Sequence, residues 1–173
     1  MQSRVLTAKR YYAIDLEKLE PIVAQLPDEE VEIASLTKIM TCYLAILIAK
    51  KYELDLKDLS FRVPDWISGT PGTSAQLEAG DILSAYDLLF ALMLPSGNDA
   101  ALSLAEVMGK AIQRHRKKEQ KRSFLDTFLA HMNLFSNELN LPQEWSNPHG
   151  LAANPNLSTA KAITGLSALA LRD

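Results

Sequence analysis

Apolar residues form one long stretch of the chain and recur at helical spacing in several others. Residues 34–51 are apolar on nearly every side, which is typical of a helix buried inside a core. Four further segments repeat apolar residues every three or four positions, and each predicts a helix: 84–94, 99–108, 124–139 and 158–171. We therefore expect a helix-rich protein.

Two short segments near the N-terminus predict strands. Residues 11–16 and 21–26 are joined by the turn-like stretch 16–20, so together they predict a hairpin. Residues 63–80 and 147–155 are rich in turn-forming residues and predict ordered loops. A two-strand hairpin followed by a helical body indicates an α+β fold.

Two residues are candidate helix caps. Ser84 precedes the helix predicted over 84–94, and Asp87 lies three residues later, where an acidic partner completes a capping box. Asp99 is a candidate cap for the next helix.

Composition limits the number of domains and the class of protein, but it does not identify a binding partner. The 173 residues suit a single domain over 1–173, and 47% hydrophobic residues suffice for a core. The net charge of −3 is too small to dictate a partner. The longest apolar run, 43–49, is too short to span a bilayer, so we expect no transmembrane segment. Residues 1–12 lack the apolar core of a secretory leader. We therefore expect an intracellular protein, a mature form whose leader was removed, or a piece of something larger.

The first candidate site is Ser35-Leu36-Thr37-Lys38. On a helix, residues three apart are neighbours on one face, so the Ser35 hydroxyl would lie beside the Lys38 amine. A serine needs a base to become a nucleophile, and a lysine whose pKa is lowered by burial can be that base. Ser158-Thr159-Ala160-Lys161 has the same spacing. Only Lys38 would lie in a helix that is apolar all round, whereas Lys161 can reach water.

The second candidate is Ser96-Gly97-Asn98, a polar turn between two apolar helices. Such a turn can hold the Ser96 and Asn98 side chains in a cleft. It can also be no more than a helix-to-helix turn capped by polar residues.

The two motifs, 61 residues apart, resemble the first two signature motifs of low-molecular-mass penicillin-binding proteins, the D-alanyl-D-alanine carboxypeptidases related to serine β-lactamases. Their surroundings resemble that family too, and nearly the whole chain takes part: Ala34 to Thr41, Leu77 to Asp81, Leu88 to Ala101, Asn147 to Leu151 and Ser158 to Lys161. The resemblance implies the family's α+β fold and a serine acyl-enzyme that hydrolyses a terminal D-Ala-D-Ala bond or binds a β-lactam.

The resemblance also implies a role for each motif residue. Ser35 would attack the carbonyl, Lys38 would be its base, and Ser96 would relay a proton to the leaving amine. Asn98 would hydrogen-bond Lys38 and the substrate amide, and the backbone N–H of Ser35 would supply half of an oxyanion hole. Neither a metal nor a cofactor is expected. The family would be extracytoplasmic, although this chain shows no leader.

The third family motif, Lys-Thr-Gly or Lys-Ser-Gly on a strand, does not occur in the chain, because Ile163-Thr164-Gly165 lacks the lysine. The C-terminal strands of the family sheet would be missing with it, and a lone hairpin is marginal with an open edge. Two hypotheses follow. Either another chain covers the edge and supplies the motif, or the protein is a catalytically degenerate structural subunit of a larger assembly.

Other residues carry weaker expectations. Residues 114–122 carry +5, leaving −8 on the rest of the chain, and form either a solvated helix end or a docking surface. Cys42, the one cysteine, is expected to be buried and unreactive. Of the histidines, His115 is expected to be solvated, His131 packed or hydrogen-bonded, and His149 structural.

Overall fold

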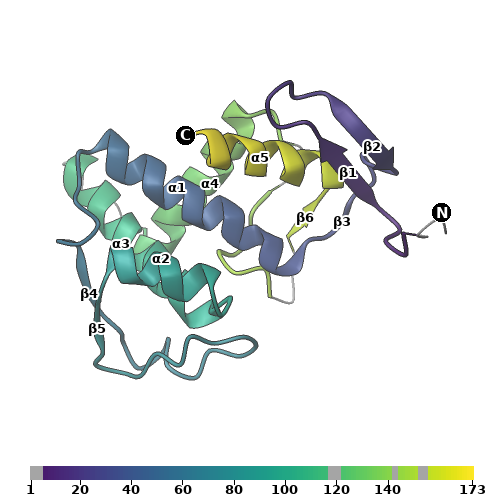
Figure 1. Ribbon diagram of the computed structural model, residues 1–173. Coiled ribbons are helices and arrows are strands. Elements are labelled where there is room, and N and C mark those ends of the chain that lie inside the picture. The colour runs from purple at the N-terminus through teal and green to yellow at the C-terminus, as the bar shows by residue number, and fades with distance from the viewer. Residues whose placement is uncertain (1–5, 117–121, 142–143, 152–155) are drawn as a thin grey trace.

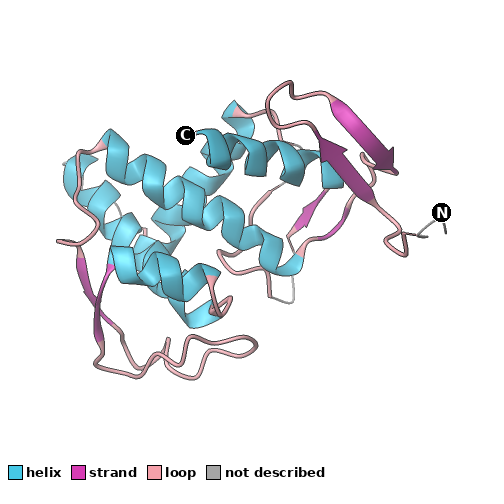
Figure 2. Ribbon diagram, viewed as in Figure 1, coloured by secondary structure: helices cyan, strands magenta, loops and turns pink. Residues whose placement is uncertain are grey.

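The computed structural model describes residues 6–116, 122–141, 144–151 and 156–173. The helices form the body of the molecule and the strands lie at its margins (Figures 1 and 2). Among the described residues the helices are a 3-10 turn at Ala34–Leu36, α1 (Thr37–Lys51), α2 (Ala85–Met93), α3 (Asn98–Arg116), α4 (Phe124–Glu138) and α5 (Ala160–Arg172).

The described strands are short and pair in twos, each pair antiparallel. The hairpin joins β1 (Tyr11–Ile14) to β2 (Pro21–Gln25), with Tyr11 opposite Gln25. The other two pairs are β3 (Val31–Glu32) with β6 (Leu157–Ser158), and β4 (Ser60–Arg62) with β5 (Ile82–Ser84). This is the helix-rich α+β architecture predicted from the sequence.

Helix α1 runs through the middle of the molecule and contacts α2, α3, α4 and α5 (Figure 1). This position explains why residues 34–51 are apolar on nearly every side, since four other helices pack against α1. The largest fully buried side chains come from several elements: Met40, Leu88, Leu92, Leu104, Met108, Phe128, Met132, Trp145 and Leu166.

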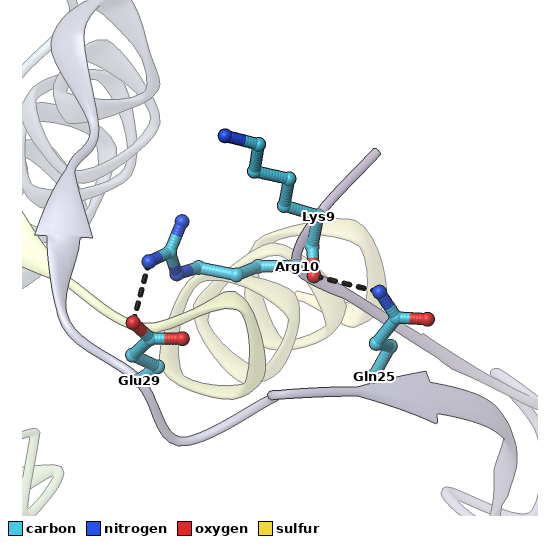
Figure 3. Close-up of polar contacts among 4 residues, drawn as sticks. All are labelled: Lys9, Arg10, Gln25 and Glu29. Atoms are coloured by element: carbon cyan, nitrogen blue, oxygen red, sulfur yellow. Dashed lines mark hydrogen bonds and ion pairs between the residues drawn. The ribbon is translucent and has the colours of Figure 1, made fainter. Parts of the chain in front are cut away.

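The hairpin lies at the edge of the body. Strand β1 packs on α5, where the Thr164 hydroxyl donates to the Tyr12 carbonyl (3.1 Å), whereas every residue of β2 is exposed. Figure 3 shows two further ties, the Gln25 amide donating to the Lys9 carbonyl (3.0 Å) and the Arg10 ion pair with Glu29. The predicted hairpin is confirmed, with slightly shorter strands.

Three sequence expectations about helix ends need correction. Helix α3 begins at Asn98, so Asp99 lies inside its first turn and is not its cap; its carboxylate accepts hydrogen bonds from Ala75 and Leu77 instead. Helix α3 also extends to Arg116. The last helix begins at Ala160 with Thr159 as its cap, because Ser158 pairs with Val31 in the β3–β6 ladder.

The basic run is described only in part. Arg114, His115 and Arg116 form the last turn of α3, where cations complement the negative end of the helix dipole. His115 is exposed as expected and stacks on Tyr52, with ring centroids 4.7 Å apart. Residues 117–121 lie outside the described residues, so a docking surface over 114–122 stays a prediction. No helix of the described residues is both long and apolar enough to cross a membrane.

The predicted capping box at α2 is confirmed. The Ser84 hydroxyl accepts from the Asp87 N–H (3.0 Å), and the Asp87 carboxylate accepts from the Ser84 N–H (3.2 Å). This cap fixes where α2 starts and therefore where its C-terminal turn, residues 94–97, lies.

Replacing the cap should destabilise the fold measurably. Ser84→Ala is expected to lower the free energy of unfolding by about 1 kcal/mol, because an N–H of the first turn loses its acceptor. Urea denaturation followed by circular dichroism would measure it. The control is Ser60→Ala on β4, whose exposed side chain should matter by less than about 0.5 kcal/mol. Equal losses in both variants would contradict the capping account.

Candidate active site

Ser35 lies at the entrance to α1, on the 3-10 turn that precedes it. Its side chain is exposed, and its turn passes directly into the first residue of α1, Thr37. Ala34, just before it, has a φ of 44°, a left-handed conformation that is costly for a residue with a Cβ. The chain therefore bends sharply at Ala34, and the bend presents the Ser35 hydroxyl at the surface.

Lys38 lies one turn further along and is almost wholly buried, with 2% of its surface exposed. Its ammonium group donates to the Ser35 hydroxyl (3.1 Å), the Asn98 amide oxygen (2.8 Å) and the His149 carbonyl (2.9 Å). Burial lowers the pKa of Lys38 to about 8, and the negative charge of Asp99 opposes the shift. A lysine with this pKa can both accept and return a proton near neutral pH.

The turn between α2 and α3 brings the second motif to the same place. Asn98, buried at the start of α3, points its amide oxygen at Lys38 and donates from its amide nitrogen to the Pro71 carbonyl (2.8 Å). Ser96 is half-buried two residues earlier, with a φ of 60°. Of the two candidate residues of this turn, Asn98 contacts Lys38, whereas the Ser96 hydroxyl is not among the three hydrogen-bond acceptors of Lys38.

The Asn147–Gly150 turn forms the third wall of the site, beside the Ser35–Lys38 turn and the turn that contains Asn98. Asn147 accepts from the backbone N–H of His149 (3.2 Å) and Gly150 (2.6 Å), which curls the turn so that the His149 carbonyl faces Lys38. Gly150 has a φ of 87°, and a Cβ there would collide with the Ala34 carbonyl. Glycine is therefore needed for this turn to pack against the backbone that precedes Ser35.

The His149 ring has a structural role, as expected. Its Nδ1 accepts from the Leu151 N–H (3.0 Å). Burial, helped by the Lys38 charge, lowers the pKa of His149 to about 4, so the ring is neutral at neutral pH. His131 is hydrogen-bonded, also as expected, through Nδ1 to the Thr127 carbonyl (2.8 Å).

Asn156 is a supporting residue that sequence reasoning missed. It is fully buried and donates to the Thr37 hydroxyl (3.0 Å) and the Asn147 carbonyl (2.9 Å), while its oxygen accepts from the Ser146 N–H (2.9 Å). It thereby joins α1 to the third wall. A lone asparagine in a loop has no periodic pattern, so the sequence offered no signal for it.

The second Ser-x-x-Lys copy has none of this environment. The Lys161 side chain is 56% exposed and forms an ion pair with Asp28 at 3.2 Å. The predicted contrast between the two copies is therefore confirmed. Among the described residues, no cluster of three or more metal-binding side chains is arranged to hold an ion.

Residues 1–173 match the D-alanyl-D-alanine carboxypeptidase family, peptidase family S11, along their whole length. The chain belongs to this family. Among curated relatives, it is 31% identical to the D-alanyl-D-alanine carboxypeptidase DacC of Escherichia coli over 84% of this chain, and 29% identical to the D-alanyl-D-alanine carboxypeptidase of a Streptomyces species over 80%. These matches cover 35% and 46% of the relatives, so the chain spans between a third and a half of their length.

Solved structures show the same fold. The D-alanyl-D-alanine carboxypeptidase DacD of Francisella tularensis superimposes with a TM-score of 0.82 at 25% identity, over 98% of this chain and 38% of that one. Penicillin-binding protein 5 of Haemophilus influenzae gives 0.80 at 25% identity, over 100% of this chain and 47% of that one. The chain therefore has part of the DD-peptidase fold.

The burial of Lys38 predicts a pH-dependent stability. Its pKa is about 8 in the folded chain against 10.5 ordinarily, so between these values the unfolded chain binds more protons and the free energy of unfolding rises with pH. Lys38→Met removes this contribution. The stability of the variant relative to the wild type should therefore fall by about 3 kcal/mol from pH 8 to 10.5.

Urea denaturation at several pH values would measure this difference. Lys161→Met removes the lysine of the other copy and separates the effect from the general loss of a positive charge. A Lys38→Met difference that stays flat across the range would contradict the assignment of Lys38 as a buried amine.

Proposed function

We propose that this chain carries the nucleophile half of a serine D-Ala-D-Ala carboxypeptidase, with residues 1–173 forming one incomplete domain. The observation that supports the proposal is the buried Lys38 amine, which lies 3.1 Å from the Ser35 hydroxyl and has a pKa of about 8. A buried amine of this kind is costly to keep, and its position beside an exposed serine is that of a general base.

The chemistry begins when neutral Lys38 takes the Ser35 proton. The Ser35 oxygen attacks the carbonyl of the peptide bond between the two D-Ala residues. As the C–N bond breaks, the proton that Lys38 took passes through the Ser96 hydroxyl to the leaving amine. The terminal D-Ala leaves, and water hydrolyses the acyl-enzyme on Ser35. A β-lactam ring would acylate Ser35 by the same attack, with its ring nitrogen in place of the leaving amine.

Two groups support this chemistry from fixed positions. The backbone N–H of Ser35 supplies one oxyanion donor, directed by the 3-10 turn that holds it. Asn98 keeps Lys38 in place through its amide oxygen. A second oxyanion donor and a lysine for the substrate carboxylate would come from the third family motif, on another segment.

The surface suited to that segment is an apolar groove between α1 and α5 together with the open edge of β1. The groove has a volume of ≈ 270 Å³ and is lined by Ile39, Cys42, Ile46, Met93 and Leu171. A separate pocket of ≈ 350 Å³ lies between α5 and β1. Among the described residues β1 pairs only with β2, so a strand from another segment can pair with β1 and cover the groove.

A structural subunit that reuses the fold is the second candidate. In that case the same groove would bind a neighbouring subunit, and Ser35 would react with no acyl donor.

A labelled penicillin discriminates between the two candidates. We expect a covalent adduct on Ser35, mapped by mass spectrometry, that disappears in Ser35→Ala and forms at least about 10²-fold more slowly in Lys38→Met. Ser158→Ala is the matched control, because it removes the serine of the other Ser-x-x-Lys copy, and it should label normally. Absence of labelling, even with all natural partners present, would support the structural subunit.

The open edge of β1 and the apolar groove lead us to expect that the chain associates with itself. The purified chain alone should self-associate in sedimentation velocity, because an open strand edge beside an apolar groove favours pairing. Ile46→Glu should shift it towards monomer by placing a charge in the groove. Ile82→Glu is the matched control, since Ile82 is an exposed isoleucine on β5, outside the groove. A wild-type chain that stays monomeric at all concentrations would count against a missing partner.

A further inference from the structure

The loop before β5 is tied to the 96–99 turn by hydrogen bonds on both sides. The Thr73 hydroxyl donates to the Ser96 carbonyl (2.6 Å), and the Thr73 carbonyl accepts from the Asn98 N–H (2.8 Å). The Asn98 amide nitrogen donates to the Pro71 carbonyl (2.8 Å). The loop thus contacts the same asparagine that holds Lys38.

Asp99 is the centre of this connection. Its side chain is buried, with 1% exposed, and one oxygen accepts from the N–H of Ala75 (2.9 Å). The other oxygen accepts from the N–H of Leu77 (3.0 Å) and from the Ser74 hydroxyl (2.7 Å). The Ala100 N–H adds a further bond (2.9 Å), so the buried charge is fully hydrogen-bonded.

Close packing accompanies these bonds. A Cβ on Gly97 would lie 2.7 Å from the Asp99 carboxylate and 2.9 Å from both the nitrogen and the Cβ of Ala75. Only glycine therefore lets the 74–77 segment and the Asp99 carboxylate meet beside the turn. The middle residue of Ser96-Gly97-Asn98 is required by this contact.

We propose that Asp99 is a positioning residue of the site, whose carboxylate fixes loop residues 71–77 against the 96–98 turn and thereby holds the Asn98 amide oxygen on Lys38. The Pro71 carbonyl sets the orientation of the Asn98 amide, since it accepts from the nitrogen and leaves the oxygen to face Lys38. We call the Asp99 hydrogen bonds to residues 74–77 the clamp. Without the clamp, the loop would move away from Asn98, and the Asn98 amide would be free to rotate. The catalytic consequence rests on the proposed function, whereas the clamp itself does not.

The carboxylate also acts on Lys38 through its charge. The titratable groups that act on Lys38 among the described residues are Asp99 on α3 and His149 in the third wall. Asp99 raises the pKa of Lys38 against the effect of burial, and His149 is neutral above about pH 4. Loss of the Asp99 charge should therefore lower the pKa of Lys38 further.

Asp99→Asn tests the clamp because it keeps the shape and removes the charge and one acceptor. Backbone amides of Ala75 and Leu77 should exchange with solvent about 10- to 100-fold faster than in the wild type, as measured by NMR. In the same sample, carbon-13 NMR of the lysine ε-carbons should show the Lys38 titration moving to lower pH. Both readouts work on the protein without any substrate.

The matched control is Asp81→Asn. Asp81 is exposed in the same loop region and accepts from the Glu78 N–H (2.9 Å), so it loses a comparable bond without touching the turn. It should change neither the exchange of Ala75 and Leu77 nor the Lys38 titration. If Asp99→Asn fails to fold, Ser74→Ala keeps the charge and removes the two bonds of the Ser74 hydroxyl, one donated to Asp99 and one accepted from the Gln76 N–H. It should speed exchange of the Leu77 amide while the Lys38 titration stays in place.

Acylation by labelled penicillin adds the functional readout. In Asp99→Asn the rate should fall about 10- to 100-fold, and the rise of the rate with pH should begin at lower pH, following Lys38. If the wild type is never labelled, the proposed function fails. Amide exchange of Ala75 and Leu77 and the titration of Lys38 still test the positioning role of Asp99 in that case. Unchanged exchange in Asp99→Asn, or faster exchange with an unmoved Lys38 titration, would overturn the positioning role.

Discussion

Burial of the Lys38 ammonium is the constraint on which the rest of the site depends. A charged group removed from water is stable only where it is hydrogen-bonded and paired. Lys38 obtains three acceptors from three separate segments, at Ser35, Asn98 and His149. The N-terminus of α1, the α2–α3 turn and the Asn147–Gly150 turn must therefore all be in place before the lysine can be buried.

Each of these segments depends on a strained or crowded backbone. Ala34 and Ser96 have left-handed φ values, and Gly150 allows a contact with the Ala34 carbonyl that no other residue permits. Such conformations persist only when their surroundings fix them. Asn156 and Asp99 supply that support from buried positions. Asn156 hydrogen-bonds both Thr37 and Asn147, and Asp99 hydrogen-bonds the distant segment 74–77. The site is held by these polar contacts around a helical core.

The same helices leave a surface that the described residues do not cover. Helix α1 contributes Lys38 to the site at its N-terminal end, and its Ile39, Cys42 and Ile46 line the groove beside α5. Burial raises the pKa of the Cys42 thiol, which agrees with the expectation of an unreactive cysteine there, although Cys42 is only half-buried. Site and groove share one helix, so a segment bound in the groove would lie next to the reacting groups.

The sequence by itself determined the helices, the hairpin, the capping box and the family, because each rests on local spacing or on contiguous motifs. Ser35 and Lys38 could be paired from sequence, since residues three apart on a helix share a face. Tertiary structure alone decided that the His149 carbonyl and not its ring meets Lys38, that the Asp99 carboxylate binds the loop residues 74–77, and that Asn156 joins Thr37 to Asn147. Those contacts depend on how whole elements pack against one another, and no local pattern in the chain carries that information.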